Sequence, residues 1–249
     1  MEESFARMEI KYLVSLSQVE ELERGLRQRG FRKMDFGSPR VQSLYYDTED
    51  HALIRASLER PVYKEKLRLR AYGDPGMLTQ SFLEIKKKYH SVVYKRRTSL
   101  PLPEAMEGLR KGLLPEKAGQ VGREAQWMLH RYELLPAAVI AYDRDAWVCP
   151  ERPEVRITFD RNLAFRDREP DLNLRVSGVL LLPADQRLME IKTGGAYPLW
   201  LTRLLEETKA RRVHFSKYGL AWQLYMQPEK EGNERSGANC SIASLLKGA

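Results

Sequence analysis

Short segments in which polar and apolar residues alternate recur along this chain of 249 residues. Alternation with a period of two predicts β-strands, because successive side chains of a strand point to opposite faces. The expected strands cover residues 7–14, 41–46, 137–147, 155–159, 173–182 and 186–192, and three more lie between residues 63 and 98. Helical periodicity predicts helices directly after the first strand, within residues 101–136, and over residues 198–208 and 216–226.

The first helix carries recognisable end signals. Ser17 and Glu20 have the spacing of a capping box, in which two side chains satisfy free backbone N–H groups of the first turn. Leu22 and Leu26 share one face of the helix, and Gly30 is placed to end it. We therefore expect the helix to start near Ser17 and to end by Gly30.

The order of these elements predicts the fold class. At least eight short strands with helices between them, and no stretch typical of a linker, favour one α+β domain. We expect a closed antiparallel eight-stranded β-barrel with surrounding helices, formed by residues 1–227. Residues 228–249 are polar and rich in Gly and Ser, which predicts a flexible tail.

Composition narrows the function classes. The chain has 42 Lys and Arg against 34 Asp and Glu, a formal net charge of +8, so an anionic partner is expected. Its apolar runs are far too short for a transmembrane segment, and its acidic N-terminus is unlike a secretory signal. Its 2 Cys supply neither a disulfide framework nor a four-ligand zinc site. These features predict a soluble, cytoplasmic protein.

The placement of cations within the strands is more informative than their number. In the segment 63–71, alternation puts Lys64, Lys66, Arg68 and Arg70 on one face and apolar residues on the other. Four like charges in a row repel each other unless water or an anion lies between them. A solvated outer face would explain one such strand, but the pattern recurs.

The tripeptide Glu-Ile-Lys occurs three times, at residues 9–11, 84–86 and 190–192. Alternation adds further cations to the same faces: Lys88, Lys95, Arg97 and Arg156. If the apolar faces pack against helices, the charged faces line the barrel interior, where each unpaired charge costs several kcal/mol. The guest that fits is a polyanion with closely spaced phosphates. Glu9, Glu84 and Glu190 would hold a divalent metal that bridges phosphoryl oxygens.

Seven strand motifs in this order resemble one known family. They are EIKY (9–12), SLYYDT (43–48), KLRLRAY (66–72), FLEIK (82–86), YKRR (94–97), MEIK (189–192) and FSKY (215–218). They resemble the VTC domain, the polyphosphate polymerase domain of the vacuolar transporter chaperone family, within the triphosphate tunnel metalloenzyme superfamily. The resemblance runs from about Met8 to Met226.

The resemblance implies an eight-stranded tunnel that binds a nucleoside triphosphate such as ATP with Mn²⁺ or Mg²⁺ and extends a polyphosphate chain. The tunnel cations of the family, which we expect to be catalytic, are matched by Lys11, Arg68, Arg70, Lys86, Lys95 and Lys217. Arg156 and Arg161 match cations of the second half, and we expect them to bind substrate with Lys66, Lys88, Arg97 and Lys192. Glu190 matches the metal-binding glutamate. DNA is not an expected partner, and a membrane partner that recruits the domain stays open.

Two other functions remain open from the sequence. One is hydrolysis of triphosphate or nucleoside triphosphates on the same fold, although only Glu9, Glu84 and Glu190 are expected to point inward. The other is a non-catalytic module that binds polyanions or RNA, with strand tyrosines such as Tyr45 and Tyr94 stacking on bases. The glutamates of the Glu-Ile-Lys motifs favour a metal-dependent phosphate site over an RNA surface.

Overall fold

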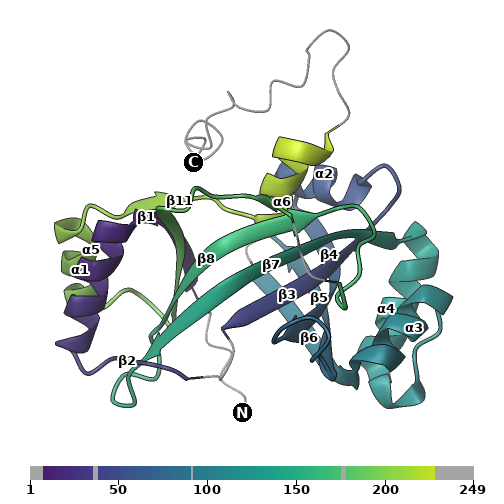
Figure 1. Ribbon diagram of the computed structural model, residues 1–249, viewed down its shortest axis with the longest axis horizontal. Coiled ribbons are helices and arrows are strands. Elements are labelled where there is room, and N and C mark those ends of the chain that lie inside the picture. Colours follow the sequence, from purple (N-terminus) through teal and green to yellow (C-terminus); the bar gives the residue numbers. More distant parts are fainter. Residues whose placement is uncertain (1–7, 36–38, 91, 175–177, 228–249) are drawn as a thin grey trace, which may run out of the picture.

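The computed structural model describes residues 8–35, 39–90, 92–174 and 178–227 (Figure 1). A single antiparallel sheet runs through this part of the chain in the order β11-β1-β10-β8-β7-β3-β4-β5-β6. Its long strands are β1 (Met8–Ser15), β3 (Arg40–Asp47), β4 (Tyr63–Tyr72), β5 (Gln80–Tyr89), β6 (Val92–Pro101), β7 (Leu135–Val148), β8 (Arg156–Arg166) and β10 (Gln186–Thr193). Three short strands add to it: β2 (Arg32–Lys33), β9 (Val179–Leu180) and β11 (Arg211–Val213). The tail predicted over 228–249 lies outside the described residues.

The α+β class and the antiparallel sheet are confirmed, but the closed eight-stranded barrel is wrong. The sheet has 11 strands, and within the described residues no pairing joins its edge strands β6 and β11. β11 is only three residues long and pairs with β1, so it covers that edge without reaching β6. The sheet is nevertheless strongly curved, with bulges between Tyr45 and Tyr46 and between Ala141 and Asp143.

One expected strand is mostly irregular. Of residues 173–182, only Val179–Leu180 forms a strand, paired with β8, and residues 175–177 lie outside the described part. Leu181 and Leu182, which belong to the same apolar run, are buried in the core instead. Burial of an apolar run does not require strand pairing, which is why the run misled the prediction.

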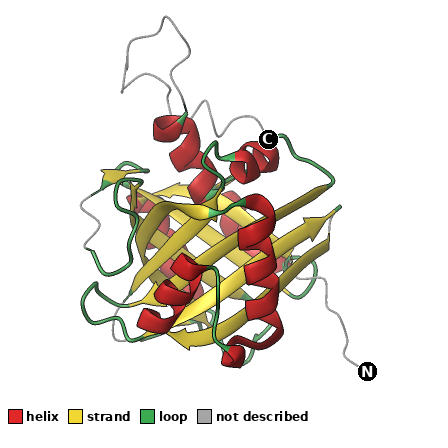
Figure 2. Cartoon of the chain, turned by 90° about the vertical axis from the view of Figure 1, so that its right-hand side faces the viewer, coloured by secondary structure: helices red, strands yellow, loops and turns green. Residues whose placement is uncertain are grey.

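Two pairs of helices cover the convex face of the sheet (Figures 1 and 2). α1 (Leu16–Arg27) and α5 (Leu199–Glu207) cover β1, β8 and β10. α3 (Leu102–Lys111) and α4 (Gly119–Tyr132), joined through η1 (Glu116–Ala118), cover β3, β4 and β5. Leu67 and Leu69 of β4 are fully buried under α3 and α4. The apolar faces of the strands therefore pack against helices, as the alternation predicts.

α1 begins earlier than expected. Its capping box is formed by Ser15 and Gln18, not by Ser17 and Glu20: Ser15 Oγ accepts from Gln18 N at 3.3 Å, and Gln18 Oε1 accepts from Ser15 N at 2.9 Å. The reason is that β1 passes directly into the helix, so that the last strand residue is also the cap. Gln18 Nε2 also donates to Thr208 O at 2.8 Å, which ties α1 to the end of α5.

A third group of helices closes one end of the concave face. α2 (Ala52–Leu58), α6 (Lys217–Ala221) and η2 (Trp222–Met226) lie beside each other in Figure 1. They contribute Ile54, Tyr218 and Trp222 to a core shared with β3, β7 and β8. The rest of the concave face is lined by charged side chains. No helix in the described residues is long and apolar enough to cross a membrane.

Candidate functional site

Cations of neighbouring strands lie side by side on the concave face. In the register of β4, β5 and β6, Lys66 is opposite Lys86, and Lys86 is opposite Lys95. One step further toward the β5–β6 turn, Lys64 is opposite Lys88. Like charges that face each other directly destabilise a sheet. The fold therefore keeps rows of cations together at a cost in stability.

Glu84 of β5 neutralises part of the neighbouring cations on the same face, which are Arg68, Arg70 and Lys95. Its Oε2 accepts from Arg68 Nε at 2.7 Å and lies 3.9 Å from Arg70 Nη1, while its Oε1 lies 2.6 Å from Lys95 Nζ. Burial raises the pKa of Glu84, but the charges of Arg68, Arg70 and Lys95 outweigh it and lower the pKa to about 2. Both carboxylate oxygens of Glu84 are thus occupied by cations.

A second charged cluster is formed by β7, β8, β10 and α6. Arg144 binds Asp160 through two parallel hydrogen bonds, Nε to Oδ1 at 2.6 Å and Nη2 to Oδ2 at 2.7 Å. Lys217 Nζ lies 2.7 Å from Asp160 Oδ2 and 3.1 Å from Glu190 Oε1. Arg144 Nη2 also donates to Glu190 Oε2 at 3.2 Å. Two buried carboxylates are therefore held by two cations.

The charge states of this cluster follow from those distances. Burial raises the pKa of Glu190, but Lys217, Lys11 and Arg144 outweigh it, so the pKa lies well below its ordinary value. Burial lowers the pKa of Lys217, but Asp160 and Glu190 outweigh it and raise the pKa. At neutral pH Glu190 and Lys217 are therefore both ionised.

Sequence reasoning missed Arg144, and it placed Asp160 on a charged strand face with Arg156 without giving it a role in the site. The bulge between Ala141 and Asp143 shifts the register of β7 against β8, which brings Arg144 opposite Asp160 on the concave face. Alternation along β7 keeps Arg144 on the face of Ile140 and Tyr142, but the register against β8, which the bulge shifts, cannot be read from it. The available signal was the cluster of charges at residues 143–145, directly after an apolar strand.

Lys11 of β1 connects the two clusters. Its Nζ donates to Phe215 O at 2.8 Å and lies 3.6 Å from Glu9 Oε1 and 3.9 Å from Glu190 Oε1. Lys192 Nζ lies 3.6 Å from the other oxygen of Glu9. The charge of Glu9 also acts on Lys86 of β5, although burial dominates and lowers the pKa of Lys86. The sheet is therefore curved strongly enough that charged side chains of β1 and β5 lie near each other across the concave face.

Two further groups have unusual pKa values. Burial lowers the pKa of Lys66 to about 8, and Lys66 Nζ donates to Ser216 Oγ at 3.3 Å. Burial raises the pKa of Tyr45, but Arg68 and Arg70 outweigh it and lower the pKa to about 8. Tyr45 Oη accepts from Arg68 Nη1 at 3.1 Å. Both groups change charge near physiological pH, and the sequence analysis assigned Tyr45 only to base stacking.

Most of the predicted site residues come together on the concave face. The cations placed there are Lys11, Lys66, Arg68, Arg70, Lys86, Lys88, Lys95, Arg97, Lys192 and Lys217, together with Glu9, Glu84 and Glu190. Arg156 lies opposite Lys192 and is exposed, at the rim of this face.

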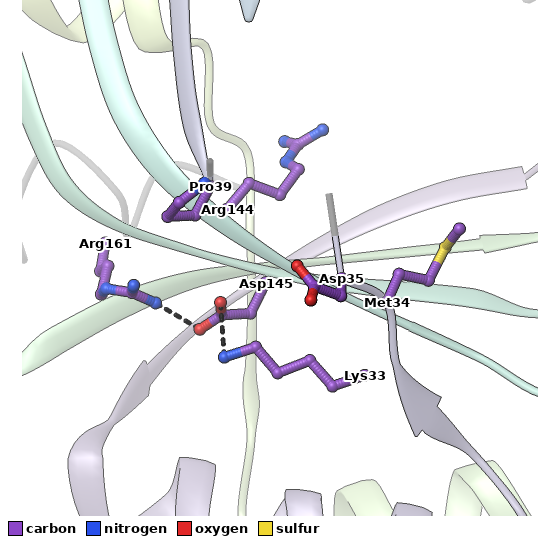
Figure 3. A pocket seen from close by; sticks show the side chains of 7 residues that line it. All are labelled: Lys33, Met34, Asp35, Pro39, Arg144, Asp145 and Arg161. Atoms are coloured by element: carbon purple, nitrogen blue, oxygen red, sulfur yellow. Dashed lines mark hydrogen bonds and ion pairs between the residues drawn. The ribbon is translucent and has the colours of Figure 1, made fainter. Parts of the chain in front are cut away.

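Arg161 does not join them. It forms an ion pair with Asp145, which also binds Lys33 at 2.7 Å, beside a pocket of about 190 Å³ that Arg144 also lines (Figure 3). Asp160 and Arg161 are consecutive in β8, so their side chains point to opposite faces. Since Asp160 faces the charged cluster, Arg161 has no place in it.

The three predicted metal ligands do not form one site. Glu84 is occupied by Arg68 and Lys95, and the described residues contain no group of three His, Cys, Asp or Glu that could hold a metal ion. Glu9 and Glu190 lie close together, since each contacts Lys11 and the charge of Glu190 raises the pKa of Glu9, but Lys217 and Arg144 hold the two oxygens of Glu190. Mg²⁺ is commonly held by one or two carboxylates and completed by substrate phosphates. The residues present fit a metal only in that shared form.

Comparison with known proteins identifies the fold and the family. A solved structure from Bacillus halodurans, provisionally named an adenylate cyclase, is similar at a TM-score of 0.52 and 14% identity, over 89% of this chain and 99% of that one. The PH1819 protein of Pyrococcus horikoshii OT3 is similar at a TM-score of 0.47 and 14% identity, over 87% of this chain and 99% of that one. No protein of curated function matches the sequence.

The family model of the VTC domain matches residues 6–226. This match spans both charged clusters and every described strand and helix, from β1 to η2. The chain therefore belongs to the VTC domain family.

Proposed function

We propose that this protein is a polyphosphate polymerase, which transfers the terminal phosphoryl group of a nucleoside triphosphate such as ATP to the end of a polyphosphate chain. Membership of the VTC domain family supports a function that concerns phosphate or triphosphate groups. The finer proposal rests on the balance of charges on the concave face.

The observation that carries the proposal is a surplus of cations beyond what the carboxylates neutralise. Glu84 is matched by Arg68 and Lys95, and the pair Asp160 and Glu190 by Arg144 and Lys217. No ion pair links a carboxylate of the described residues to these remaining cations: Lys64, Lys66, Lys86 and Lys88. Lys64, Lys66 and Lys88 are half-buried and Lys86 is exposed, so the cost lies in the repulsion between neighbouring cations, and a chain of phosphates offsets it with charges at close spacing.

The two clusters suit the two substrates. Arg68, Arg70, Lys86 and Lys95 of the β4–β5–β6 part would bind the nucleoside triphosphate, and the planar guanidinium groups can bind phosphate oxygens in pairs. The acceptor chain would lie toward Lys192 and Lys217, with Arg156 at the rim. Lys11, which contacts Glu190 and whose charge also acts on Lys66, would lie between donor and acceptor.

The reaction asks little covalent chemistry of the protein. The terminal phosphate of the acceptor forms a new P–O bond to the γ-phosphorus, the bond to the β-phosphate oxygen breaks, and the nucleoside diphosphate leaves. An acceptor phosphate is already ionised at neutral pH, so no general base is required. The residues contribute alignment and neutralisation of the charge on the transferred group. Glu9 would hold a Mn²⁺ or Mg²⁺, joined by Glu190 once phosphates of the substrate draw Lys217 away from it, and the metal would supply further neutralisation when bound.

Hydrolysis of triphosphates is the second candidate on this fold, and the carboxylates disfavour it. A hydrolase has to orient water, often with two metals held by several free carboxylates. Glu84 and Glu190 have cations at both oxygens. Neither is therefore available as a base for water.

The test is incubation of the pure protein with ATP and Mn²⁺, followed by gel analysis with a stain for polyphosphate. We expect a ladder that lengthens with time and disappears with Lys86→Ala or Glu190→Gln. Lys87→Ala is the matched control, because Lys87 is the next residue of β5 but pairs with Glu65 and Glu124 on the convex face.

Each outcome has a defined meaning. Free phosphate without a ladder would replace the polymerase with a triphosphatase. If polyphosphate binds but neither product forms, the protein is a binding module. Activity of Glu190→Gln equal to that of the wild type would contradict the role given to Glu190.

A further inference from the structure

A fully buried carboxylate lies just outside the charged clusters. Asp47, the last residue of β3, is 0% exposed. Its Oδ1 accepts from the backbone N–H groups of Thr48 and Leu53, both at 2.9 Å. Its Oδ2 accepts from Ile54 N at 3.1 Å and from Tyr218 Oη at 3.0 Å. Asp47 therefore joins the end of β3, the start of α2 and the helix α6.

α6 depends on such outside contacts for its position. It has five residues, Lys217–Ala221, and passes directly into η2, and so short a helical segment has little stability of its own. Ser216 caps it through Gly219 N at 3.2 Å. The next anchor is the hydroxyl of Tyr218, which donates to Asp47 and lies 3.4 Å from His51 Nδ1. Because Lys217 precedes Tyr218 directly, the anchor at Tyr218 fixes the place from which Lys217 reaches Asp160 and Glu190.

The same tyrosine also contacts the other cluster. The ring of Tyr218 stacks on that of Tyr45 with 4.9 Å between centroids and 19° between planes. Tyr45 Oη in turn accepts from Arg68 Nη1 at 3.1 Å. Tyr218 therefore has a link to each cluster. Lys217 is its neighbour in the chain, and Tyr45, on which its ring stacks, accepts a hydrogen bond from Arg68.

We propose that Asp47 is a positioning residue, which aligns Lys217 and Arg68 through the hydroxyl and ring of Tyr218. The two cations belong to the separate clusters that would hold acceptor and donor, so this anchor sets their relative placement. The activity part of the inference rests on the proposed polymerase function, whereas the positioning of Lys217 does not.

Substitution of Asp47 itself is a poor first test. Asp47→Asn replaces an acceptor oxygen by an NH₂ group, which cannot accept from the donors that Asp47 binds, and it would also disturb the start of α2. Tyr218→Phe removes one hydroxyl and keeps the stacked ring. Tyr46→Phe is the matched control, because Tyr46 is also buried and adjacent to Tyr45 but faces the core under α3 and α4.

The decisive experiment is a double-mutant cycle of Tyr218→Phe and Lys217→Ala, read by the rate of polyphosphate synthesis. We expect Tyr218→Phe to lower kcat by roughly ten- to a hundredfold, since small misplacements cost that much in transfer reactions. In the Lys217→Ala background, assayed at a protein concentration at which its residual rate is measurable, Tyr218→Phe should cause a clearly smaller loss, because only the alignment of Arg68 remains to be disturbed. Losses that multiply would show that Tyr218 acts independently of Lys217, and they would overturn the proposal.

A second readout does not depend on activity. Lys217 is 9% exposed, so an amine-reactive ester should label it slowly, with exposed Lys111 as the internal reference. Labelling followed by mass spectrometry should be severalfold faster in Tyr218→Phe and unchanged in Tyr46→Phe. If the wild type makes no product, the proposed function fails while this readout still decides the positioning. Equal labelling of Lys217 in wild type and Tyr218→Phe would refute it.

Discussion

At the scale of single residues, Glu84 is the carboxylate whose partners are most plainly defined. It is 2% exposed and lies among Arg68, Arg70 and Lys95. Glu84→Gln leaves those cations without a counter-charge, so we expect the free energy of unfolding to fall by roughly 3 kcal/mol. Thermal unfolding with and without tripolyphosphate measures this loss. The anion should raise the Tm of the variant more than that of the wild type.

The control for Glu84→Gln is a buried carboxylate on the other face of the same sheet. Glu65 is 4% exposed and binds Tyr63, Tyr132 and Lys87 on the convex face. Glu65→Gln should also destabilise the protein, but tripolyphosphate should stabilise that variant no more than the wild type. Equal recovery of both variants by the anion would contradict the placement of Glu84 in the site.

The depressed pKa of Glu84 also predicts an acid dependence. The folded pKa of about 2 lies below the ordinary value of 4.5, so the ionised form stabilises the folded state. This contribution is fully present above pH 4.5 and is lost as the pH falls from there toward 2. Urea unfolding between these pH values should show a smaller loss of stability for Glu84→Gln than for the wild type. Parallel curves would argue against the ion pairs.

Lys66 predicts a pH dependence of binding at the alkaline side. Burial lowers its pKa to about 8, and a bound polyanion would raise it again. Affinity for tripolyphosphate should therefore be full below pH 8 and fall as the pH rises through 8. Calorimetry at pH 8.5 should detect uptake of protons on binding. Lys66→Arg stays charged at these pH values, so its affinity should depend less on pH. Tyr45 also has a pKa of about 8, and Tyr45→Phe shows how much of the pH dependence comes from that group.

At the scale of elements, β5 separates its functions by face. Lys88 faces the concave side opposite Lys64, beyond the row that contains Lys86. A chain longer than a triphosphate can reach this outer row, so Lys88→Ala should lower affinity for long polyphosphate more than for tripolyphosphate. Lys87→Ala should leave both affinities unchanged and cost stability through Glu65 and Glu124. Titrations with phosphate chains of graded length measure the difference, and equal losses at every length would contradict it.

The elements also show where prediction from sequence works and where it ends. Alternation places Lys66, Arg68 and Lys86 correctly, because a regular strand preserves the period of two. It also keeps Arg144 on the face of Ile140 and Tyr142, but it does not give the pairing with Asp160, since the extra residue of the bulge in β8 shifts the register. The anchor of Asp47 on Tyr218 joins residues 171 positions apart, and no local pattern encodes such a contact. Regular strands were thus predictable, whereas bulges and long-range hydrogen bonds were not.

At the scale of the whole molecule, local sequence patterns also could not show whether the sheet closes into a barrel. The eight long strands of the expected barrel are present, but the count of strands does not decide whether the edges pair. β6 presents six consecutive exposed residues, 92–97, which include Lys95, Arg96 and Arg97. Charged side chains on an edge strand disfavour pairing with another strand. Curvature alone brings the charged faces together, and an open edge beside them leaves the site accessible from the side.

The surplus of cations predicts how the stability of the whole molecule responds to salt. The rows of Lys64, Lys66, Lys86 and Lys88 repel each other across the concave face. The Debye length falls from about 30 Å at 0.01 M to about 8 Å at 0.15 M ionic strength, so salt should screen this repulsion. The Tm of the free protein should therefore rise between these two concentrations. Bound tripolyphosphate neutralises the same rows, and with it the rise should vanish or reverse, because salt then weakens attraction. Lys86→Met should reduce this rise of the Tm in the free protein, whereas Lys87→Met should leave it unchanged. If the Tm of the free protein falls as salt is added, the surplus of cations on the concave face is not a source of instability.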